Sequence, residues 1–584
     1  MALQPRYRWD LLPLLTLGPE LLQAAGRHGI SERVAAVLIR RGVAAPADLD
    51  RFFGPPGAGL HDPALLPDAE AFAERVGRAR ARGERVMVFG DFDADGLTGL
   101  AIMTRVLRRL GIAVEPYVPS RQDEGHGLSL AAVERAVATG CGLIITVDTG
   151  TSSVAEVAAA VARGIDVAIT DHHRVPAVLP VAVAIVNAHR ADSRYPDRRL
   201  AGSGVAFKLG QLLLADQDGG PAFALGLADL ATIGTVADVA PVLGENRAIA
   251  RMGLALIRDE ARPAIAALLG KAGGQRGAVD LETVSFVLAP RLNAAGRVGE
   301  ALDAANLLLT DDPAHAEELA GRLEAANMLR RELTKSAIAA ARTSPAVLED
   351  QPATVVRGPW SVGIVGLVAA RLAEERGRPA VVGAELGDVV RASCRSDGGM
   401  DLAAALEACG DLLVRHGGHR GAAGFEIAAD RWESFRERFL SIAGAAGPLE
   451  VMPALAIDLD VPARAVSYDL LRELASLGPC GPGHPEPLVV IRDMEVVRVR
   501  EAAGGHAQLT VRRERDVLDA IAFGWPELAA QARPGDRLDV VARLVSRRFG
   551  GLETLQLDVK DAAPTIHARA AGEARVAGAA GGPR

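Results

Sequence analysis

The stretch RVMVFGDFDADGLTG, at Arg85–Gly99, decides the fold class of this chain. Its apolar, β-branched start shows no polar alternation, which predicts a strand buried on both faces, and the apolar periodicity of Leu97–Leu110 predicts a helix directly after it. The same order of strand, loop and helix returns at GLIITV, which ends before Asp148, and at IDVAIT, which ends before Asp171. These repeats predict an α/β fold with a parallel sheet and right-handed crossovers.

Acidic residues follow each of these predicted strands. Because the carboxyl ends of parallel strands meet at one edge of a sheet, clusters that are separate in the sequence should lie together in space. The repulsion between so many carboxylates would be costly without a cation. The group comprises Asp91, Asp93, Asp95, Asp148, Asp171, His172, His173 and, after an apolar helical segment that stops at Pro241, Asp238.

Aspartates with one or two imidazoles, and without thiolates, suit Mn²⁺ or Mg²⁺ better than a structural zinc ion. Several carboxylates suggest two ions, which could bridge a phosphoryl oxygen and activate water. A calcium-binding EF-hand loop is excluded, because its twelfth position would be Ile102 instead of a bidentate Glu. A solvated acidic turn, and a histidine pair with one surface and one core member, remain the alternatives.

Composition limits the class of protein. The chain has 584 residues, 49% of them hydrophobic and 24% charged, which indicates several globular domains. Apolar runs are interrupted well before the ~18 residues of a membrane span, so no membrane association is expected. The segment Leu11–Leu22 resembles a signal peptide, but it contains Pro13, Pro19 and Glu20, and export is not expected.

The cysteines and the net charge say less about function. Four scattered cysteines form neither a disulfide framework nor a zinc motif, which favours a reducing cytoplasm. The net charge of -8 argues against bulk attraction to nucleic acid, although a local basic channel or bound metal could reverse the sign.

Changes in pattern predict six segments. The acidic strand-end loops belong to the second, an α/β domain, and a long helix begins near Asp311, Asp312 and Pro313. A second α/β pattern follows, then short strands with Gly, Pro and Asp breaks that are typical of a small barrel. The predicted segments are a helical lead-in at 1–80, a domain at 81–310, a connector helix at 311–345, an α/β domain at 346–450, a barrel at 451–562 and a disordered tail at 563–584.

The motifs GDFDADG, VDTG, TDHH, GTVADVAP and APRLNAAGR occur in this order, and together they resemble the DHH phosphoesterase superfamily, in particular its single-strand-specific 5′ to 3′ exonucleases. The resemblance implies a DHH catalytic domain, a DHH-associated domain and a C-terminal OB-fold barrel. It implies metal ligation by Asp93, Asp95, Asp148, His172 and Asp238. Asp91, Asp171 and His173 would then be nearby catalytic or acid/base groups.

Basic and glycine-rich segments are candidates for substrate binding. Two guanidiniums and an amide on one short segment suit a phosphate clamp, whereas most arginines form surface ion pairs and most glycine-rich turns are only turns. The candidates are Arg291, Asn293 and Arg297; Arg121, Ser393 and Arg395 for a terminal phosphate; Gly418 and His419 in GGHRGAAGF; and His126.

The barrel should bind a strand mainly through phosphates, since stacking aromatics are sparse. Its candidates are Phe549 and the arginines Arg498, Arg500, Arg512, Arg513, Arg547 and Arg548. Three positions depart from the family pattern without touching a proposed metal ligand: His126 replaces Tyr, Ser361 replaces His and His484 replaces Asn.

The resemblance implies a cytoplasmic, monomeric exonuclease that uses two divalent ions, Mn²⁺ or Mg²⁺, to degrade single-stranded DNA to mononucleotides in recombination and repair. A helicase and a single-strand-binding protein would be its partners. One alternative is a phosphodiesterase of short oligonucleotides or cyclic dinucleotides, which would not need the barrel. The other is a non-catalytic DNA-binding scaffold, which should have lost its metal aspartates.

Overall fold

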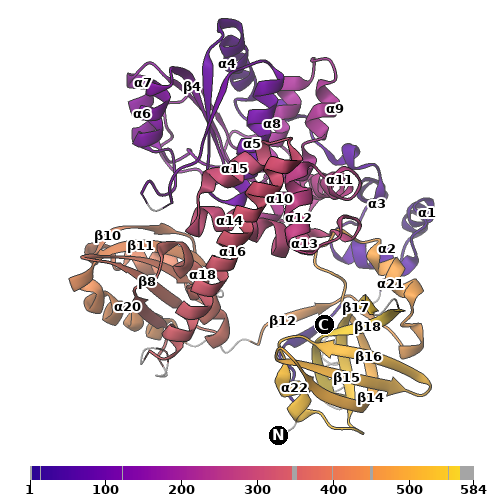
Figure 1. The fold of residues 1–584 in the computed structure, drawn as a ribbon. Coiled ribbons are helices and arrows are strands. Elements are labelled where there is room, and N and C mark those ends of the chain that lie inside the picture. Colours follow the sequence, from indigo (N-terminus) through magenta and orange to yellow (C-terminus); the bar gives the residue numbers. More distant parts are fainter. Residues whose placement is uncertain are drawn as a thin grey trace, which may run out of the picture. The chain divides into compact units, whose positions relative to one another are not determined.

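The chain forms two compact units in the computed structural model (Figure 1), one of residues 59–449 and one that joins residues 1–58 to residues 450–584. The predicted lead-in at 1–80 is therefore divided between the two units. Most of the predicted tail lies outside the described residues. The structure describes residues 3–12, 15–121, 123–344, 347, 351–396, 399–447, 452–549 and 552–565.

The first domain of unit 59–449 contains the predicted parallel sheet. Its strand order is β3-β2-β4-β5-β6, and all neighbours are parallel. Side chains alternate between two cores: Val86 and Val88 face the core that includes α5, whereas Met87 and Phe89 face α6 and α7. The strands are β2 (Arg85–Gly90), β3 (Val114–Tyr117), β4 (Cys141–Val147), β5 (Asp166–Thr170) and β6 (Ala184–Val186).

Helices cover both faces of this sheet, and three of them pack against one another. Helices α5 (Ala94–Arg109), α8 (Gly202–Leu214) and α10 (Ala228–Ala237) are buried nearly all round. The apolar segment Gly220–Ala237 is long enough to cross a membrane, but 67% of it is buried inside this domain, as in a core helix. The others are α4 (Ala69–Arg82), α6 (Leu130–Ala138), α7 (Val154–Ala162), α9 (Gly220–Leu225), α11 (Gly244–Glu260), α12 (Pro263–Lys271), α13 (Leu281–Thr283), α14 (Ala289–Val298) and α15 (Ala301–Leu309).

The predicted connector helix is α16 (Pro313–Arg342), whose N-cap Asp312 accepts a hydrogen bond from the Ala314 amide at 3.0 Å. Thirty residues span ~45 Å. Its first half buries Leu319 and Leu323 in the core of the sheet domain, and its second half buries Ala337 and Ala341 against the next domain. The helix therefore belongs to both hydrophobic cores.

The second domain of this unit is built on a mixed sheet of order β10-β11-β9-β8-β7, in which only β7 and β8 are parallel. One face packs against α18, and the other packs against α19 and α20. The elements are β7 (Thr354–Gly358), α18 (Val362–Arg376), β8 (Ala380–Leu386), β9 (Val389–Arg395), α19 (Leu402–Glu407), β10 (Leu413–Gly418), β11 (Ala422–Ala428) and α20 (Trp432–Ala446).

The other unit contains the predicted barrel. Strands β14 to β18 form a sheet that the β14–β17 pairing closes. The chain start belongs here because β1 (Arg8–Leu11) pairs in parallel with β12 (Ala454–Ile457). Its other elements are α1 (Pro19–Arg27), α2 (Glu32–Arg40), α3 (Pro46–Phe53), β13 (Leu459–Asp460), α21 (Tyr468–Ala475), β14 (Val489–Ala502), β15 (His506–Arg513), β16 (Asp516–Ala522), α22 (Pro526–Gln531), β17 (Arg537–Phe549) and β18 (Leu552–Pro564).

Gly234 of α10 allows this helix to approach α5 and α8. A Cβ at this position would lie 2.2 Å from Ser203 Oγ, 2.4 Å from Asp95 Oδ1 and 2.5 Å from Thr98 Oγ1. We expect Gly234→Ala to lower the free energy of unfolding by about 1–3 kcal/mol, because buried, hydrogen-bonded groups would have to shift. Urea denaturation followed by circular dichroism measures this.

Gly321→Ala is the matched control, since Gly321 lies inside α16 with no atom within 4 Å of a Cβ. That change should raise the free energy of unfolding by about 0.5–1 kcal/mol. Equal effects of the two substitutions would show that the close approach at Gly234 is not a packing constraint.

Candidate metal centre

The acidic loop between β2 and α5 is held in place by backbone hydrogen bonds. Asp93 is the N-cap of α5, and its Oδ1 accepts from the amides of Asp95 and Gly96 at 3.0 and 3.1 Å. Asn293 Oδ1 accepts from the amide of Ala94 at 2.8 Å. Asp91 is 4% exposed, and its buried Oδ1 has no hydrogen-bond partner among the described residues. One carboxylate of the loop is thus left with an unsatisfied oxygen.

Asp95 differs from Asp91 in that both of its carboxylate oxygens accept hydrogen bonds from backbone amides. Its Oδ2 accepts from the amide of Gly202 at 2.7 Å, and its Oδ1 accepts from the amide of Ser203 at 3.0 Å. These donors are the first residues of α8, where unpaired amides favour an anion. The Asp95 carboxylate therefore joins the start of α5 to the start of α8.

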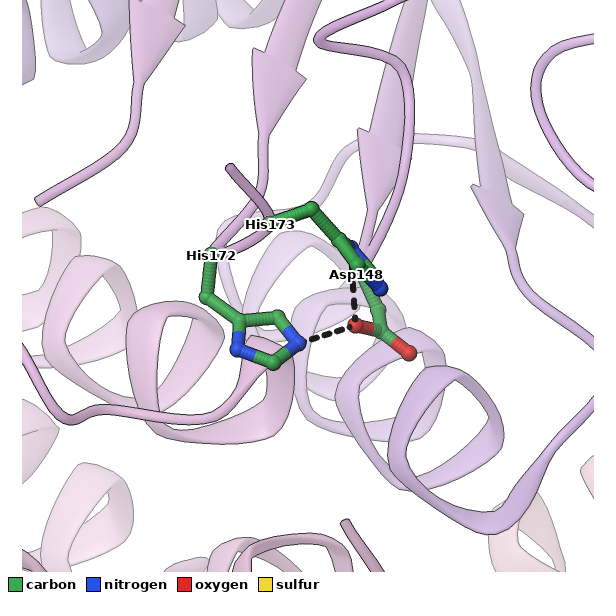
Figure 2. Close-up of side chains that lie close together, drawn as sticks. All are labelled: Asp148, His172 and His173. Carbon is green, nitrogen blue, oxygen red and sulfur yellow. Dashed lines mark ion pairs between the residues drawn. The ribbon is translucent and has the colours of Figure 1, made fainter. Parts of the chain in front are cut away.

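Asp148 follows β4 in a left-handed conformation, with φ of 63°. Figure 2 shows its carboxylate facing both histidines: Oδ1 lies 3.0 Å from His172 Nε2 and 3.9 Å from His173 Nδ1. Neither Asp148 Oδ1 nor His172 Nε2 has a hydrogen-bond partner among the described residues, although both atoms are buried. Buried polar atoms of this kind require a partner, and a cation would supply one.

Asp171 orients the two histidines. Its Oδ1 accepts from the amides of His172 and His173 at 2.7 and 3.1 Å, and lies 2.8 Å from His173 Nδ1. Its Oδ2 accepts from the amide of Thr151 at 3.0 Å. The side chain of Asn187 donates to the carbonyl oxygen of His173 at 2.9 Å, which further fixes this loop.

The ligand atoms form three overlapping groups within unit 59–449, each with all atoms within 4.8 Å of one another. The groups share Asp148 or His172, so the arrangement has room for more than one cation. Oxygen and imidazole ligands without thiolates fit Mn²⁺ or Mg²⁺. The groups are Asp91, Asp93 and Asp148; Asp148, His172 and His173; and Asp95, His172 and Asp238.

Protonation reflects the crowding of these charges. Burial, with repulsion from neighbouring aspartates, raises the pKa of Asp93 to about 6, that of Asp238 to about 8 and that of Asp148 well above its usual value. The hydrogen bond with Asp171 raises the pKa of His173 to about 9. Burial lowers the pKa of His172, which keeps that imidazole neutral and able to bind a metal.

Arginines stand beside the acidic cluster. The Arg121 guanidinium lies 4.0 Å from the ring centroid of Phe92, the residue between Asp91 and Asp93. Arg297 Nη1 donates to the carbonyl oxygen of Gly363 at 3.0 Å, and burial lowers the pKa of Arg297 to about 10. A Cβ at Gly366 would lie 3.2 Å from Arg395 Nη2 and 3.4 Å from Ser393 Oγ.

The remaining predicted substrate-binding residues occupy different environments. Arg291 Nε donates to Glu324 Oε2 at 2.5 Å and Nη1 to the carbonyl oxygen of Val287 at 2.8 Å, so its guanidinium is held between α14 and α16. His126 Nδ1 lies 3.2 Å from Asp91 Oδ2, with 69% of its side chain exposed. Gly418 and His419 are exposed at the end of β10.

The predicted arginines of the barrel are partly engaged within it. Arg512 pairs with Glu495 at 3.0 Å, Arg500 donates to Gln508 Oε1 at 2.6 Å, and Arg513 Nη1 donates to the carbonyl oxygen of Arg492 at 2.6 Å. Arg547 lies 5.8 Å from the ring of Phe523. Arg498 is exposed on β14. The side chains of Arg548 and Phe549 lie outside the described residues.

Sequence reasoning missed the partners that position the cluster, among them Thr151, Asn187 and the start of α8. The signal for α8 was AGSG at 201–204, where glycines precede an apolar run and predict exposed helix-start amides. No local signal shows that these amides bind Asp95, because the two segments are more than 100 residues apart.

Comparisons with known proteins agree with this geometry. The DHH family, N-terminal domain, matches residues 85–235, the DHHA1 domain matches residues 350–445, and the RecJ OB domain matches residues 457–561. The single-stranded-DNA-specific exonuclease RecJ of Dickeya dadantii is 35% identical over 89% of this chain and 93% of its own length. That of Bacillus subtilis is 35% identical over 91% of this chain and 68% of its own length.

The fold is shared as well. The crystal structure of RecJ in complex with Mn²⁺ from Thermus thermophilus matches with a TM-score of 0.80 and 31% identity, and the match covers 95% of this chain and 79% of that chain. The Mg²⁺ complex from the same organism matches with a TM-score of 0.76. These likenesses confirm the predicted sheet domain, DHH-associated domain and OB barrel. The chain therefore belongs to the RecJ family of DHH proteins.

Proposed function

We propose that this chain is a metal-dependent exonuclease that hydrolyses single-stranded DNA from the 5′ end to mononucleotides. The observation that carries the proposal is a set of buried atoms that have no hydrogen-bond partner among the described residues and belong to side chains of the ligand groups: Asp91 Oδ1, Asp148 Oδ1 and His172 Nε2. Cations bound to these groups would satisfy such atoms. Family membership supports the substrate, since the relatives are named as single-stranded-DNA-specific exonucleases.

Two divalent ions, Mn²⁺ or Mg²⁺, would supply an activated water and a counter-charge for the reacting phosphoryl group. The donor set fits such ions, because it consists of carboxylate oxygens and one neutral imidazole. We assign ligand roles to both Asp91 and Asp95, since each offers an oxygen to one of the three ligand groups. The proposed ligands are Asp91, Asp93, Asp95, Asp148, His172 and Asp238, which adds Asp91 to the set that the sequence predicts.

His173 serves best as the acid/base group. Asp171 holds His173 Nδ1 at 2.8 Å, while 52% of the His173 side chain is exposed, so that its Nε2 can exchange a proton with the leaving oxygen. Asp171 is thus a positioning residue. The guanidiniums of Arg121, Arg297 and Arg395 would hold phosphates of the strand, with Ser393 and the exposed Gly418–His419 turn beside the terminal one.

The barrel supports a long single strand as substrate over a short oligonucleotide or cyclic dinucleotide. All the aspartates of the proposed metal centre are present, which argues against a non-catalytic scaffold. We also propose a cytoplasmic monomer that receives its strand from a helicase and a single-strand-binding protein. The burial of Cys141, Cys394 and Cys409 as free thiols supports a reducing compartment.

Digestion of end-labelled strands tests the reaction. With MnCl₂, single-stranded DNA should release mononucleotides from its 5′ end, and a 5′-phosphorylated strand should react faster than a 5′-hydroxyl strand because the arginines can bind the extra phosphate. Duplex DNA and RNA strands are run in parallel to define the substrate. Arg395→Gln should abolish the difference between the two ends.

Arg391→Gln is the matched control on the same strand, since the Arg391 guanidinium is paired with Glu426 at 3.0 Å. This variant should keep the preference for a 5′-phosphate. Release of nucleotides from the 3′ end, or equal rates on both kinds of 5′ end, would contradict the proposal.

Asp91→Asn and Asp95→Asn distinguish the role of Asp91 from that of Asp95, whose carboxylate also accepts hydrogen bonds from the start of α8. Asp91→Asn should reduce the rate of hydrolysis more than ~100-fold without lowering the thermal midpoint, because it removes a buried charge. Asp95→Asn should lower the thermal midpoint, because an amide replaces the charged acceptor of two backbone amides. A fully active Asp91→Asn enzyme would show that Asp91 is not a metal ligand, and a fully active Asp95→Asn enzyme would show the same for Asp95.

Metal binding should be coupled to pH. Asp93, Asp148, Asp238 and His173 all have raised pKa values in the fold, so the metal-free native state binds more protons than the unfolded chain. These groups should make its free energy of unfolding fall as pH rises from about 4 to about 9. The lowered pKa values of His172 and His189 oppose the fall near their unfolded values, and those of Asp171, Asp197 and Glu426 oppose it at the acidic end.

Thermal denaturation of EDTA-treated protein across this range measures the effect. Added MnCl₂ should raise the midpoint more at pH 8 than at pH 5.5, because protons then compete less for the ligands. Asp148→Asn should weaken the pH dependence of the midpoint and also the pH dependence of its increase with MnCl₂. A larger stabilisation by Mn²⁺ at the acidic end would contradict the ligand set.

A further inference from the structure

Four guanidiniums of unit 59–449 come from α14, α16, β9 and the segment after β3, and the charge of the one on α14, Arg297, interacts with the charges of the other three. Among the described residues, none of these four forms an ion pair with a carboxylate within 4.0 Å. Three of them belong to the proposed phosphate-binding set, but the fourth, on α16, has no role in the proposed reaction so far. The four are Arg121, Arg297, Arg330 and Arg395.

Arg330 is held in a defined position. Its Nη2 donates to Asn327 Oδ1 at 3.0 Å, and Asn327 is only 3% exposed. Its Nε is buried and has no hydrogen-bond partner among the described residues. A neutral amide orients this guanidinium but does not neutralise it. The site therefore leaves a positive charge and at least one directed donor available to an anion.

Arg291 on α14 is an example of an arginine whose charge is used to hold α14 and α16 together. It pairs with Glu324 of α16 at 2.5 Å and also donates to a backbone carbonyl. Arg330 lies less than two turns beyond Glu324 along α16, and its guanidinium donates to the neutral Asn327, with no carboxylate of the described residues within 4.0 Å. The contrast indicates that the charge of Arg330 is not used to hold α14 and α16 together.

Backbone contacts connect Arg330 to the metal centre. A Cβ at Gly296 would lie 2.5 Å from the carbonyl oxygen of Phe92, so α14 touches the acidic loop. A Cβ at Gly299, just past α14, would lie 3.3 Å from the Cβ of Ala326, one turn before Arg330. Arg297 occupies the position between these two contacts. The arginines therefore lie on segments that contact one another: Arg121 beside the acidic loop, Arg297 on α14 and Arg330 on α16.

Electrostatics support the same interpretation. Burial and the neighbouring positive charges of Arg121 and Arg330 lower the pKa of Arg297, and burial with Arg331 and Arg291 lowers the pKa of Arg330. Like charges that are partly desolvated are unfavourable until an anion lies between them. A phosphate bridging Arg297 and Arg330 would relieve this repulsion.

We propose that Arg330 is a substrate-binding residue that, together with Arg297, binds a backbone phosphate of the single strand, next to the phosphate held by Arg121 and Arg395. The proposal rests on the proposed function and adds a contact from the connector helix. In this arrangement α16 does more than join the two domains. It carries Asn327 as the positioning residue and Arg330 as the phosphate ligand.

Binding of a fluorescent single strand to the full chain, in EDTA and at several salt concentrations, tests the proposal. Arg330→Gln should weaken binding about tenfold and reduce the slope of log affinity against log salt by ~0.7, the value for one phosphate contact on a single strand. Arg322→Gln is the matched control, because Arg322 lies on the same helix, exposed and paired with Glu318 at 2.7 Å. It should change neither quantity.

Binding and degradation by the unsubstituted chain distinguish a failure of the proposed function from a failure of the role of Arg330. If it neither binds nor degrades single strands, the proposed function fails; if it does both while Arg330→Gln behaves like Arg322→Gln, only the role of Arg330 is overturned. Should Arg330→Gln fail to fold, phenylglyoxal labelling of the native chain decides, read by peptide mass spectrometry. A bound strand should protect Arg330 but not Arg322, and equal labelling with and without the strand would overturn the proposal.

Discussion

Repulsion between buried carboxylates is the constraint on which the catalytic unit depends. Asp91, Asp95, Asp148 and Asp171 are each less than 5% exposed and gather at the ends of three neighbouring strands. The fold holds them by supplying backbone amides to Asp95 and Asp171, and it leaves oxygens of Asp91 and Asp148 without partners among the described residues. What backbone donors do not satisfy must be satisfied by a cation, so the same crowding that weakens the apo fold creates the affinity for metal.

The charged side chains around the metal centre form two sets, one of carboxylates and one of guanidiniums. Carboxylates lie at the sheet edge, while the guanidiniums that approach them come from other elements and keep their charge for a ligand. The phosphates of a single strand, placed between metal ions on one side and arginines on the other, would neutralise the positive charge of the ions and that of the arginines. The net charge of -8 is therefore uninformative about the partner, because the relevant field is local. Close approaches to backbone atoms at Gly296 and Gly363 connect the segment of Arg297 to the acidic loop and to α18.

Sequence patterns predicted the parallel sheet, the connector helix and the gathering of acids, since each follows from a local period or from the geometry of strand ends. The family resemblance placed Asp95 among the metal ligands and Asp91 beside them, but the spacing in DFDADG could not show that the start of α8 donates two hydrogen bonds to Asp95. Sequence patterns likewise could not show that Arg291 forms an ion pair with Glu324, whereas Arg330 forms none with a carboxylate of the described residues. Such differences arise from contacts between residues distant in the sequence, where spacing carries no information.

Residues near the start of the sequence pair with the barrel unit through one buried carboxylate. Asp561, fully buried, accepts hydrogen bonds from the amides of Arg6 and Tyr7 and from Trp9 Nε1 at 3.0, 3.2 and 2.6 Å. The barrel unit is thus built from residues 1–58 and 450–584, and residues 59–449 form a separate compact unit between these two segments in the sequence. Because the contacts of Asp561 join residues more than 550 positions apart, a buried carboxylate with three donors, and not local sequence, decides that the first strand belongs to the barrel unit.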